Sequence, residues 1–502
     1  MRSIHFLLIA VFLARTAHAG NVDFVVMLGE RQLFFDDVDI AEKKNVKRVM
    51  HQPVKKGAVI RPAPSLPVSS VQIRMTPIWH PQKNVWQLWD CAASPNDLHA
   101  AGQMASGYYE STDGLHWAKP VLGLIEYRGS KQNNYVNHRL GGRAERLDCI
   151  IRDETDPDPT RRYKTAVPDV FGHRVGGTAV SPDGIHWTEI RHIGIRAADE
   201  WNLTFDAKKR LYLHYLKRRG KYGRAVWLST SRDFETWTEP KLIFEADDLD
   251  QELGVKRIKA RLATPSLQQP VYNDPNDYNV DVYTMTPFRY ESVYLGMPAM
   301  YHATGKNTIR NTDGFHIIEL VSSRDLDKWT RQDDRRAFIP PSPIDSGAYD
   351  TVQMISPSGA VVHGDELWLY YTGLRSRGPG YKERFGGGRK GLDGLGGAIC
   401  LAILRRDGFV SLDASETPGI VRTRPFVPAS AHLFVNVNAR GGELHVEALD
   451  TAGKVIDKST PILDDLRGFK VQWETDGITE RRPVSLRFQL RNASLYSYWF
   501  ES

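Results

Sequence analysis

Hydrophobic and polar residues alternate in short runs along most of the chain, as they do in half-buried strands, and helical periodicity is nearly absent. The strand-like runs form successive groups, which are 71–79 with 86–91, 147–151 with 162–167 and 177–180, 201–205 with 211–216 and 225–229, 278–286 with 292–297 and 317–321, and 352–355 with 366–372 and 397–404. The sequence therefore predicts an all-β protein.

A short turn pattern punctuates these groups. It reads STDGLHW at 111–117, SPDGIHW at 181–187, SRDFETW at 231–237 and SRDLDKW at 323–329, and a weaker copy, RRDGFV, stands at 405–410. Asp can accept hydrogen bonds from its own backbone, Gly allows a positive φ, and the Trp begins the outgoing strand. We expect Trp117, Trp187, Trp237 and Trp329 to occupy equivalent places in four successive sheets, with Asp407 marking a fifth.

The intervals between the tryptophans are unequal, which suits the blades of a propeller with variable loops better than a solenoid. We therefore predict a five-bladed β-propeller over residues 20–424. Beyond the prolines at 425 and 428 the pattern changes to closely spaced strands at 433–437, 443–449, 469–473, 484–490 and 495–500. These predict a small C-terminal β-sandwich over 425–502.

The first nineteen residues read as a signal peptide. Arg2 gives the positive start, 6–14 the apolar stretch, and Ala17-His18-Ala19 a small-x-small cleavage site. No later apolar run approaches the length that a membrane span requires. We expect a secreted or periplasmic protein that is cut after Ala19.

Composition narrows the class further. The chain has 502 residues with 41% hydrophobic, 12 Trp and 20 Tyr, and its formal charge of +6 is spread along it, which gives no case for nucleic acid. Cys91, Cys149 and Cys400 each lie in an apolar run and are expected to be buried thiols, with one disulfide left open. No Cys/His spacing suggests zinc, so no cofactor is expected, although a structural cation at the propeller axis stays open.

At this point a resemblance can be stated. The motifs that carry it are LFFDD (33–37), RVMHQP (48–53), RRYK (161–164), DEWN (199–202), YESVYLG (290–296), GDELWLYY (364–371), RRDGFVSLDA (405–414) and LRFQLRNASLYSYWF (486–500). Together with the Asp/Trp turns, they make the chain similar to the secreted five-bladed propeller enzymes of the invertase and arabinanase superfamily, glycoside hydrolase families 32 and 43. Within it, they resemble bacterial family-32-like proteins.

The sequence departs from the superfamily in three places. The invertase motif Trp-Met-Asn-Asp-Pro-Asn-Gly is absent, the second-blade Arg-Asp-Pro stands only as Arg152-Asp153-Glu154, and no Glu-Cys dipeptide occurs. The turns also resemble sialidase Asp boxes but lack the extra residue between Asp and Gly. No arginine triad of the neuraminidase type can be assigned.

Glycoside hydrolysis requires two carboxyl groups, one protonated and one ionised, and a propeller places them at its axis. The resemblance implies a third-blade general acid, which is Glu200 here, with a pKa raised by partial desolvation beside Trp201. Asp153 resembles the second-blade aspartate that orients the transition state. Asp36 and Asp37 are first-blade candidates for base or nucleophile, with closure of the ring as the alternative.

Other candidates follow from their places beside expected strands. Glu291 interrupts an aromatic run and must be catalytic or paired, with Arg289 as the structural partner, because burying a lone carboxylate is costly. Asp199 and Asp350 precede inner strands and are candidate substrate-binding residues. Asp350 could bind sugar hydroxyls or a cation. His51 is either a hydrogen-bonded core histidine or a substrate-binding residue.

The loop over 373–392 is strongly basic, and Arg375 and Arg389 are its candidate substrate-binding residues. It is either a solvated hairpin tip or a lip that grips carboxylate or sulfate groups. The Gly-Lys-Ser/Thr ending of a phosphate loop is missing.

These observations predict a secreted glycoside hydrolase that acts on a poly- or oligosaccharide, with an anionic glycan left open. The alternatives are a propeller that binds glycans without catalysis and a sialidase-like enzyme with arginines around an axial Tyr. Carbohydrate is the expected partner. Sugar identity, stereochemistry and oligomeric state are not determined by the sequence.

Overall fold

A computed structural model of the protein describes residues 24–62, 70–91, 104–172, 176–308, 312–375, 396–478 and 482–502. The described chain is all-β apart from one α-helix and four short 3-10 helices. Contacts divide it into two compact units: unit 1 is Met1–Lys47 with Leu412–Ser502, and unit 2 is Arg48–Ser411. No helix among the described residues is long and apolar enough to cross a membrane.

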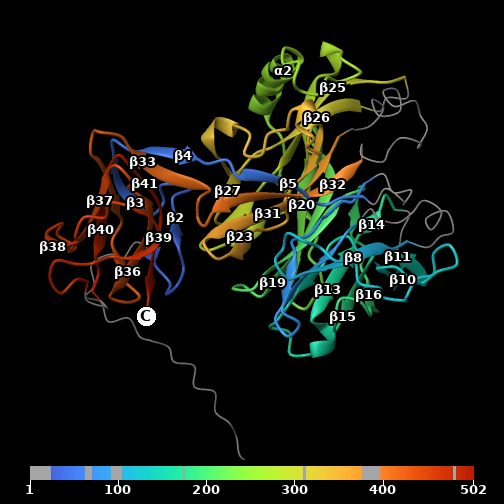
Figure 1. Cartoon of the computed structure of the whole chain (residues 1–502), viewed down its shortest axis with the longest axis horizontal. Helices are drawn as coiled ribbons and strands as arrows, with labels where there is room; N and C mark the ends of the chain where they lie inside the picture. The colour runs from blue at the N-terminus through green and yellow to red at the C-terminus, as the bar shows by residue number, and fades with distance from the viewer. Residues whose placement is uncertain are drawn as a thin grey trace, which may run out of the picture. The chain divides into compact units, whose positions relative to one another are not determined.

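Antiparallel strands dominate unit 2, and its described strands fall into five groups in chain order (Figure 1). The first group is β6 (Ile78–His80), β7 (Val85–Trp89), β8 (Ser106–Ser111) and β9 (Tyr135–Val136). The second is β12 (Ile151–Arg152), β13 (Tyr163–Val167), β15 (Gly177–Ser181) and β16 (Thr188–His192). The third is β18 (Trp201–Asp206), β19 (Leu211–Gly220), β20 (Gly223–Ser231) and β21 (Lys241–Phe244).

The fourth group consists of two sheets. One sheet holds β22 (Asn279–Thr284), β25 (Ala299–Lys306) and β26 (Thr312–Ile318), and the other holds β23 (Phe288–Tyr290), β24 (Val293–Gly296), β27 (Val321–Ser323) and β28 (Thr330–Arg331). The fifth group is β29 (Gln353–Ile355), β31 (Glu366–Leu374), β32 (Gly397–Arg405) and β5 (Val54–Ile60), with β30 (Val361–His363) beside β31. The early strand β5 thus completes the last group.

Smaller elements join the groups. They are the hairpin β10 (His138–Leu140) with β11 (Arg143–Glu145), the parallel pair β14 (Asp169–Val170) with β17 (Arg196–Ala197), and the 3-10 helices η1 (Pro159–Arg161), η2 (Pro275–Asp277), η3 (Asp333–Arg335) and η4 (Ile344–Ser346).

Side-chain hydrogen bonds join each group to the next. The links are Ser106 Oγ to the Leu147 carbonyl at 3.0 Å, Cys149 Sγ to the Trp201 carbonyl at 3.2 Å, Thr204 Oγ1 to the Pro287 carbonyl at 3.1 Å, Thr284 Oγ1 with Ser356 Oγ at 3.3 Å, and the Ile73 amide to Thr372 Oγ1 at 2.9 Å. The last link returns from the fifth group to the segment that leads into the first.

The four Asp/Trp turns lie at equivalent places, each after the third strand of a different group, as the repeat predicts. In the second group, Ser181 Oγ accepts from the Gly184 amide at 2.8 Å, and Asp183 Oδ1 accepts from the Ile185 and His186 amides at 2.8 Å. The residue after Asp is left-handed in every copy, with φ of 74° at Gly114, 78° at Gly184, 65° at Phe234 and 67° at Leu326.

A helix that the hydrophobic pattern did not indicate connects the third and fourth groups. This helix, α2 (Asp248–Leu262), packs against β22 and β25 (Figure 1). Asp247 is its N-cap, and a capping box joins Asp247 and Asp250 through each other's backbone amides. Its buried residues are few, which explains why no apolar stripe marks it in the sequence.

Unit 1 contains two larger antiparallel sheets. One runs β39 (Asp465–Lys470), β36 (His432–Asn438), β41 (Ala493–Glu501) and β33 (Val410–Ala414), with β2 (Gln32–Leu33) beside β41. The other runs β3 (Ile40–Lys44), β34 (Gly419–Thr423), β40 (Ser485–Arg491), β37 (Glu443–Leu449) and β38 (Val455–Lys458). A parallel pair, β1 (Phe24–Val25) with β35 (Phe426–Val427), completes the unit.

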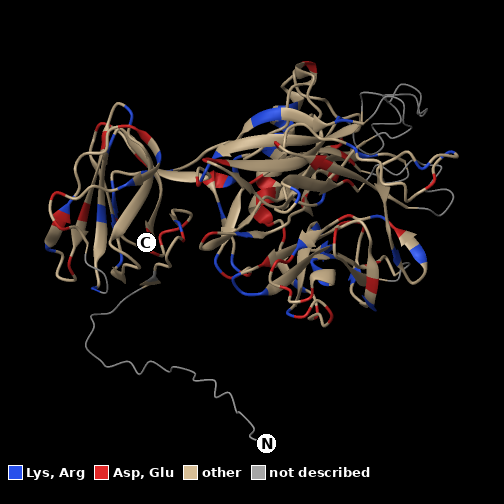
Figure 2. Cartoon of the chain, turned by 60° about the horizontal axis from the view of Figure 1, so that its bottom comes forward, with Lys and Arg blue, Asp and Glu red and all other residues tan. Residues whose placement is uncertain are grey.

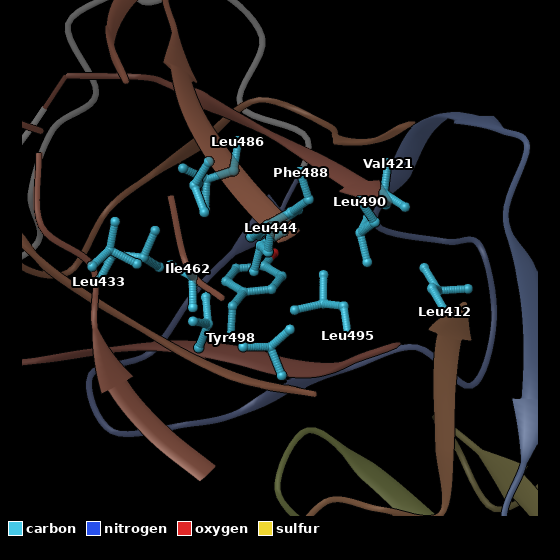
Figure 3. Close-up of a cluster of buried hydrophobic side chains, with 14 of the residues drawn as sticks. Leu412, Val421, Leu433, Leu444, Ile462, Leu486, Phe488, Leu490, Leu495 and Tyr498 are labelled. Carbon is cyan, nitrogen blue, oxygen red and sulfur yellow. The ribbon is translucent and has the colours of Figure 1, made fainter. Parts of the chain in front are cut away.

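Both sheets of unit 1 contribute to one hydrophobic core (Figure 3). Leu433 and Leu495 come from the first sheet and Leu444 and Phe488 from the second, and all four side chains are fully buried. Burying such a side chain contributes about 1.5–3 kcal/mol. This shared core is what holds the two sheets together.

Candidate active site

The central feature of unit 2 is a buried ion pair between Arg74 and Glu200. Arg74 Nε lies 2.5 Å from Glu200 Oε2, and its Nη2 lies 2.8 Å from Oε1, so the contact is bidentate. Arg74 also donates to the Ile73 carbonyl and to Gln72 Oε1, both at 3.1 Å. Glu200 precedes β18 of the third group, whereas Arg74 precedes β6 of the first.

The electrostatic effect on Glu200 is opposite to the expectation from its sequence neighbours. Burial favours the protonated form, but the charge and hydrogen bonds of Arg74, with a further contribution from Lys217, outweigh it and lower the pKa of Glu200. The prediction of a raised pKa at Glu200 was therefore wrong in direction. The cause is Arg74, which lies far from Glu200 in the sequence.

Asp148 is a second buried carboxyl group near this pair, and the sequence analysis missed it. It lies in the segment before β12, and its side chain is 4% exposed. Arg146 Nε is 2.6 Å from its Oδ1, yet that oxygen accepts no well-aligned hydrogen bond from the described residues. Burial raises the pKa of Asp148 more than Arg146 and Arg74 lower it. The signal in the sequence was an acid interrupting the apolar run LDCII.

Two carboxyl groups of this region therefore have pKa values driven in opposite directions. Arg74 acts electrostatically on both Asp148 and Glu200, and the charge of Glu200 disfavours ionisation of Asp148. Glu200 is held ionised by its bidentate partner, and Asp148 is pushed towards the protonated form by burial. Such a divergence is what separates an acid from a base in a catalytic pair.

Lys217, on β19, lies on the other side of Glu200. Its Nζ is 2.7 Å from Asp199 Oδ1 and 4.1 Å from the ring centre of Tyr283. Burial lowers the pKa of Lys217, and the charges of Glu200 and Asp199 oppose this. Arg224 also stacks on Tyr283, at 5.1 Å.

A small cavity of about 10 Å³ lies beside these groups. Its lining includes Glu200, Asn202, Lys217, Tyr283 and Thr284. A cavity of about this size holds one water when it offers two to four polar partners. The geometry therefore suits a single water next to the Glu200 carboxylate.

Acidic residues of this part of unit 2 are paired with basic ones, and Lys, Arg, Asp and Glu are interspersed on its strands (Figure 2). Asp350 is buried, with Lys55 Nζ at 2.8 Å and a hydrogen bond from the Tyr371 hydroxyl at 2.8 Å. Asp199, by contrast, is exposed and keeps only its contact with Lys217 among the described residues. Of these two acids, Asp199 is the one whose carboxylate is accessible to a sugar hydroxyl.

Asp153, the second-group candidate, lies in a different cavity from Glu200. It accepts from the Tyr212 hydroxyl at 2.5 Å and from Thr155 Oγ1 at 2.7 Å, with Lys164 Nζ at 3.7 Å. Burial opposes ionisation, but these hydrogen bonds prevail and lower the pKa of Asp153. The structure does not bring Asp153 to the Arg74–Glu200 pair.

Glu291 and its expected partner are also placed apart from that pair. Glu291 lies half-buried in the tight turn between β23 and β24 with φ of 53°. Arg289 Nη1 lies 3.8 Å from Asp206 Oδ2, and its guanidinium lies over the ring of Tyr294.

The remaining candidates lie elsewhere or outside the described residues. Asp37 belongs to unit 1, where Lys43 Nζ is 2.8 Å from its Oδ2, and Asp36 accepts from the Val38 amide. His51 Nε2 lies 2.7 Å from Ser411 Oγ. Arg375 donates to the Ala348 carbonyl at 2.9 Å and stacks on Tyr349. Arg389 lies in 376–395, and the expected signal peptide in 1–23, both outside the described residues.

The cysteines are free and buried, as their apolar surroundings indicated. Cys91 adjoins Arg74, and burial raises its pKa to about 12. Within the described ranges, no three His, Cys, Asp or Glu side chains are grouped so that they could hold a metal ion.

Comparison with known proteins finds similarity in structure only, because no family model and no curated protein sequence matches the chain. One similar structure is a family 43 arabinoxylan arabinofuranohydrolase from Bacillus subtilis, at 9% identity and TM-score 0.35, covering 89% of this chain and 99% of that one.

A second is a family 32 β-fructofuranosidase from Bombyx mori, at 10% identity and TM-score 0.33, covering 88% of this chain and 93% of that one. A third is an α-L-arabinanase from Penicillium chrysogenum, at 12% identity and TM-score 0.33, covering 72% of this chain and 99% of that one. Glycoside hydrolases of families 32 and 43 are thus among the similar structures. The identities and TM-scores are too low for the activity of these proteins to be transferred to this chain.

Proposed function

We propose that unit 2 is a five-bladed β-propeller and that the two sheets of unit 1 form a β-sandwich. Three observations support the propeller: five strand groups in chain order, equivalent Asp/Trp turns in four of them, and side-chain links that return from the fifth group to the first. In such a fold, the segments leading into the first strands converge at the axis. Arg74, Asp148 and Glu200 all lie in segments of this kind.

We propose that the protein is a glycoside hydrolase with Asp148 and Glu200 as its catalytic carboxyl groups. The observation that carries this proposal is the opposite protonation bias of two buried carboxyl groups, both of which lie within the electrostatic influence of Arg74. Hydrolysis of a glycosidic bond needs one group of each kind. Glu200 keeps its expected place in the site, but its proposed role changes from acid to base.

The reaction then proceeds with a balanced transfer of protons. Asp148 donates its proton to the glycosidic oxygen as the bond to the anomeric carbon breaks. Glu200 accepts a proton from the adjacent water, whose oxygen bonds to that carbon. Arg74 holds the Glu200 carboxylate in place, while Asp199 accepts hydrogen bonds from sugar hydroxyls.

The test is a hydrolysis screen of the purified chain over arabino-, fructo-, fuco-, uronate- and sulfate-bearing oligosaccharides, followed by Glu200→Gln and Asp148→Asn on any substrate found. We expect each substitution to lower kcat by about 10²–10⁴-fold, because each removes one proton-transfer group. Asp153→Asn serves as a matched control and should keep most of the activity. Full activity in both Glu200→Gln and Asp148→Asn would contradict the assignment.

One observation favours a second function, which is glycan binding without catalysis. The bidentate contact with Arg74 occupies both oxygens of Glu200, as it would in a site that recognises sugars through a neutralised ion pair. This alternative predicts saturable binding of an oligosaccharide with no release of reducing ends. Calorimetry and a reducing-end assay on the same ligand separate the two functions.

A further inference from the structure

A groove unrelated to the Arg74–Glu200 pair lies where the second and third strand groups adjoin. Its volume is about 400 Å³, within the range of small-molecule sites of about 300–1,000 Å³. It is lined on one side by the end of β16 and the segment up to β17, and on the other by β19 and the turn that holds Trp237. Its lining contains no residue of the proposed catalytic pair.

Three arginines line this groove: Arg191, Arg196 and Arg218. Arg191 and Arg196 are exposed, and Arg218 is half-buried with its guanidinium 5.1 Å from the ring centre of Trp227. Only Arg196 has an ion-pair partner among the described residues, and that contact with Asp169 is long, at 3.7 Å. Arg191 and Arg218 therefore have no ion-pair partner among the described residues, and the ion pair of Arg196 is long.

The acids of the groove do not cancel these charges. Glu235 is already paired with Arg161, whose Nη1 lies 3.1 Å from its Oε1, so Glu239 is the remaining acid in the lining. Guanidinium groups bind carboxylates and sulfates through paired N–H donors, which makes arginine the preferred residue for such anions. The charge of the groove therefore favours an anionic ligand.

Trp237 adds an aromatic surface and a donor without an acceptor. In the equivalent turn of the second group, Trp187 Nε1 donates to the Gly184 carbonyl at 3.0 Å. Trp237 is half-buried, and its Nε1 has no acceptor among the described residues. Phe234, which replaces the turn glycine, and His214 pack against its ring at 5.7 and 5.5 Å. Its place in the lining suits the apolar face of a sugar ring.

We propose that this groove is a second carbohydrate-binding site, specific for oligosaccharides that carry carboxylate or sulfate groups. The arginines bind the anionic groups, and Trp237 packs against a sugar ring between them. The site is independent of Asp148 and Glu200. It would hold an acidic glycan on the protein whether or not the chain hydrolyses that glycan.

The proposal is tested by calorimetry on the full chain with three probes of equal length: an oligogalacturonate, a sulfated oligosaccharide and a neutral arabino-oligosaccharide. We expect binding of at least one anionic probe, weakened by salt, and an affinity reduced about tenfold or more in Arg191→Ala/Arg196→Ala because two charge-assisted contacts are lost. Both residues are exposed, so this variant keeps the fold. The two anionic probes distinguish a uronate from a sulfate ligand.

Two controls locate the binding. Arg219→Ala removes an exposed arginine next to Arg218 that does not line the groove, and it should bind as the unmodified chain does. Asp148→Asn/Glu200→Gln should also keep the binding, and its loss there would assign the ligand to the proposed catalytic site. Equal affinity for neutral and anionic probes, unchanged binding in the double arginine variant, or no binding of either anionic probe would overturn the proposal.

Discussion

At the scale of single residues, the Arg74–Glu200 pair reverses the usual effect of burial on the pKa of a carboxyl group. A buried carboxylate usually has a raised pKa, and Glu200 would have one if its surroundings were only apolar. Two short contacts from one guanidinium reverse that tendency. Such a pair does not by itself add much stability, because both ions lose their hydration on folding.

The first prediction is that Arg74→Met destabilises the fold by about 3–5 kcal/mol, because it leaves the Glu200 charge buried without its partner. Urea unfolding followed by tryptophan fluorescence measures the loss. The double variant Arg74→Met/Glu200→Met should recover most of it, since both charges are then absent. A double variant as unstable as Arg74→Met alone would show that packing around Arg74, rather than its charge, is responsible.

At the scale of elements, the Asp/Trp turns use their Ser and Asp side chains to accept hydrogen bonds from the backbone amides of the turn. Asp183 caps two amides while Ser181 caps a third, so the turn satisfies its own backbone within a few residues. Gly184 must be left-handed, and Trp89 Nε1 of the first group donates to its carbonyl at 3.0 Å. The turn therefore also joins the second group to the first.

The second prediction concerns this glycine. A Cβ at Gly184 would lie 2.5 Å from Trp89 Cζ2, and φ there is +78°. Gly184→Ala should cost about 2–4 kcal/mol, combining strain with overpacking against a fully buried ring.

Gly194→Ala is the matched control in the same strand group, since no atom lies within 4 Å of its Cβ position. It should change the free energy of unfolding by less than about 1 kcal/mol. Thermal and urea unfolding of the two variants in parallel measure the difference, and equal destabilisation would refute the account.

At the scale of the whole molecule, unit 2 buries histidines without charging them. Burial lowers the pKa of His138 to about 4, and the pKa of His214 and His302 to about 3. Their ordinary value is 6.5, so the unfolded chain binds more protons than the native chain below about pH 6.5. The free energy of unfolding should therefore fall as the pH drops through this window.

The third prediction isolates one of these groups. Neither ring nitrogen of His214 has a hydrogen-bond partner among the described residues, so His214→Phe keeps the shape and removes the titration. Between neutral pH and about pH 5, the free energy of unfolding of this variant should fall by about 2 kcal/mol less than that of the unmodified chain.

Burial raises the pKa of the Asp148 and Glu319 carboxyl groups, so these groups favour the folded state at low pH, against the effect of the histidines. Their contribution is the same in His214→Phe and in the unmodified chain, so it cancels when the two are compared. Urea unfolding from about pH 4.5 to 7.5 measures the pH dependence of both proteins, and parallel profiles for His214→Phe and the unmodified chain would contradict the prediction.

The sequence by itself determined the local features of this protein. The strands, the equivalent Asp/Trp turns and the buried cysteines were predicted because alternation and turn chemistry act between residues a few positions apart. The helix α2 was not predicted, because its sequence has a capping box but no apolar stripe. The lowered pKa of Glu200 was not predicted, because the residue that causes it is distant in the sequence.

Only the tertiary structure decided the electrostatics and the pairing of strands that are distant in the sequence. Arg74 reaches Glu200 across 126 residues, and β5 pairs with β32 from the opposite end of unit 2. The raised pKa of Asp148 comes from its burial, and the carboxylate of Asp153 contacts Tyr212 and Lys164. A pKa depends on the charges and solvent within a few ångströms, and which charges those are is fixed only when distant segments pack together.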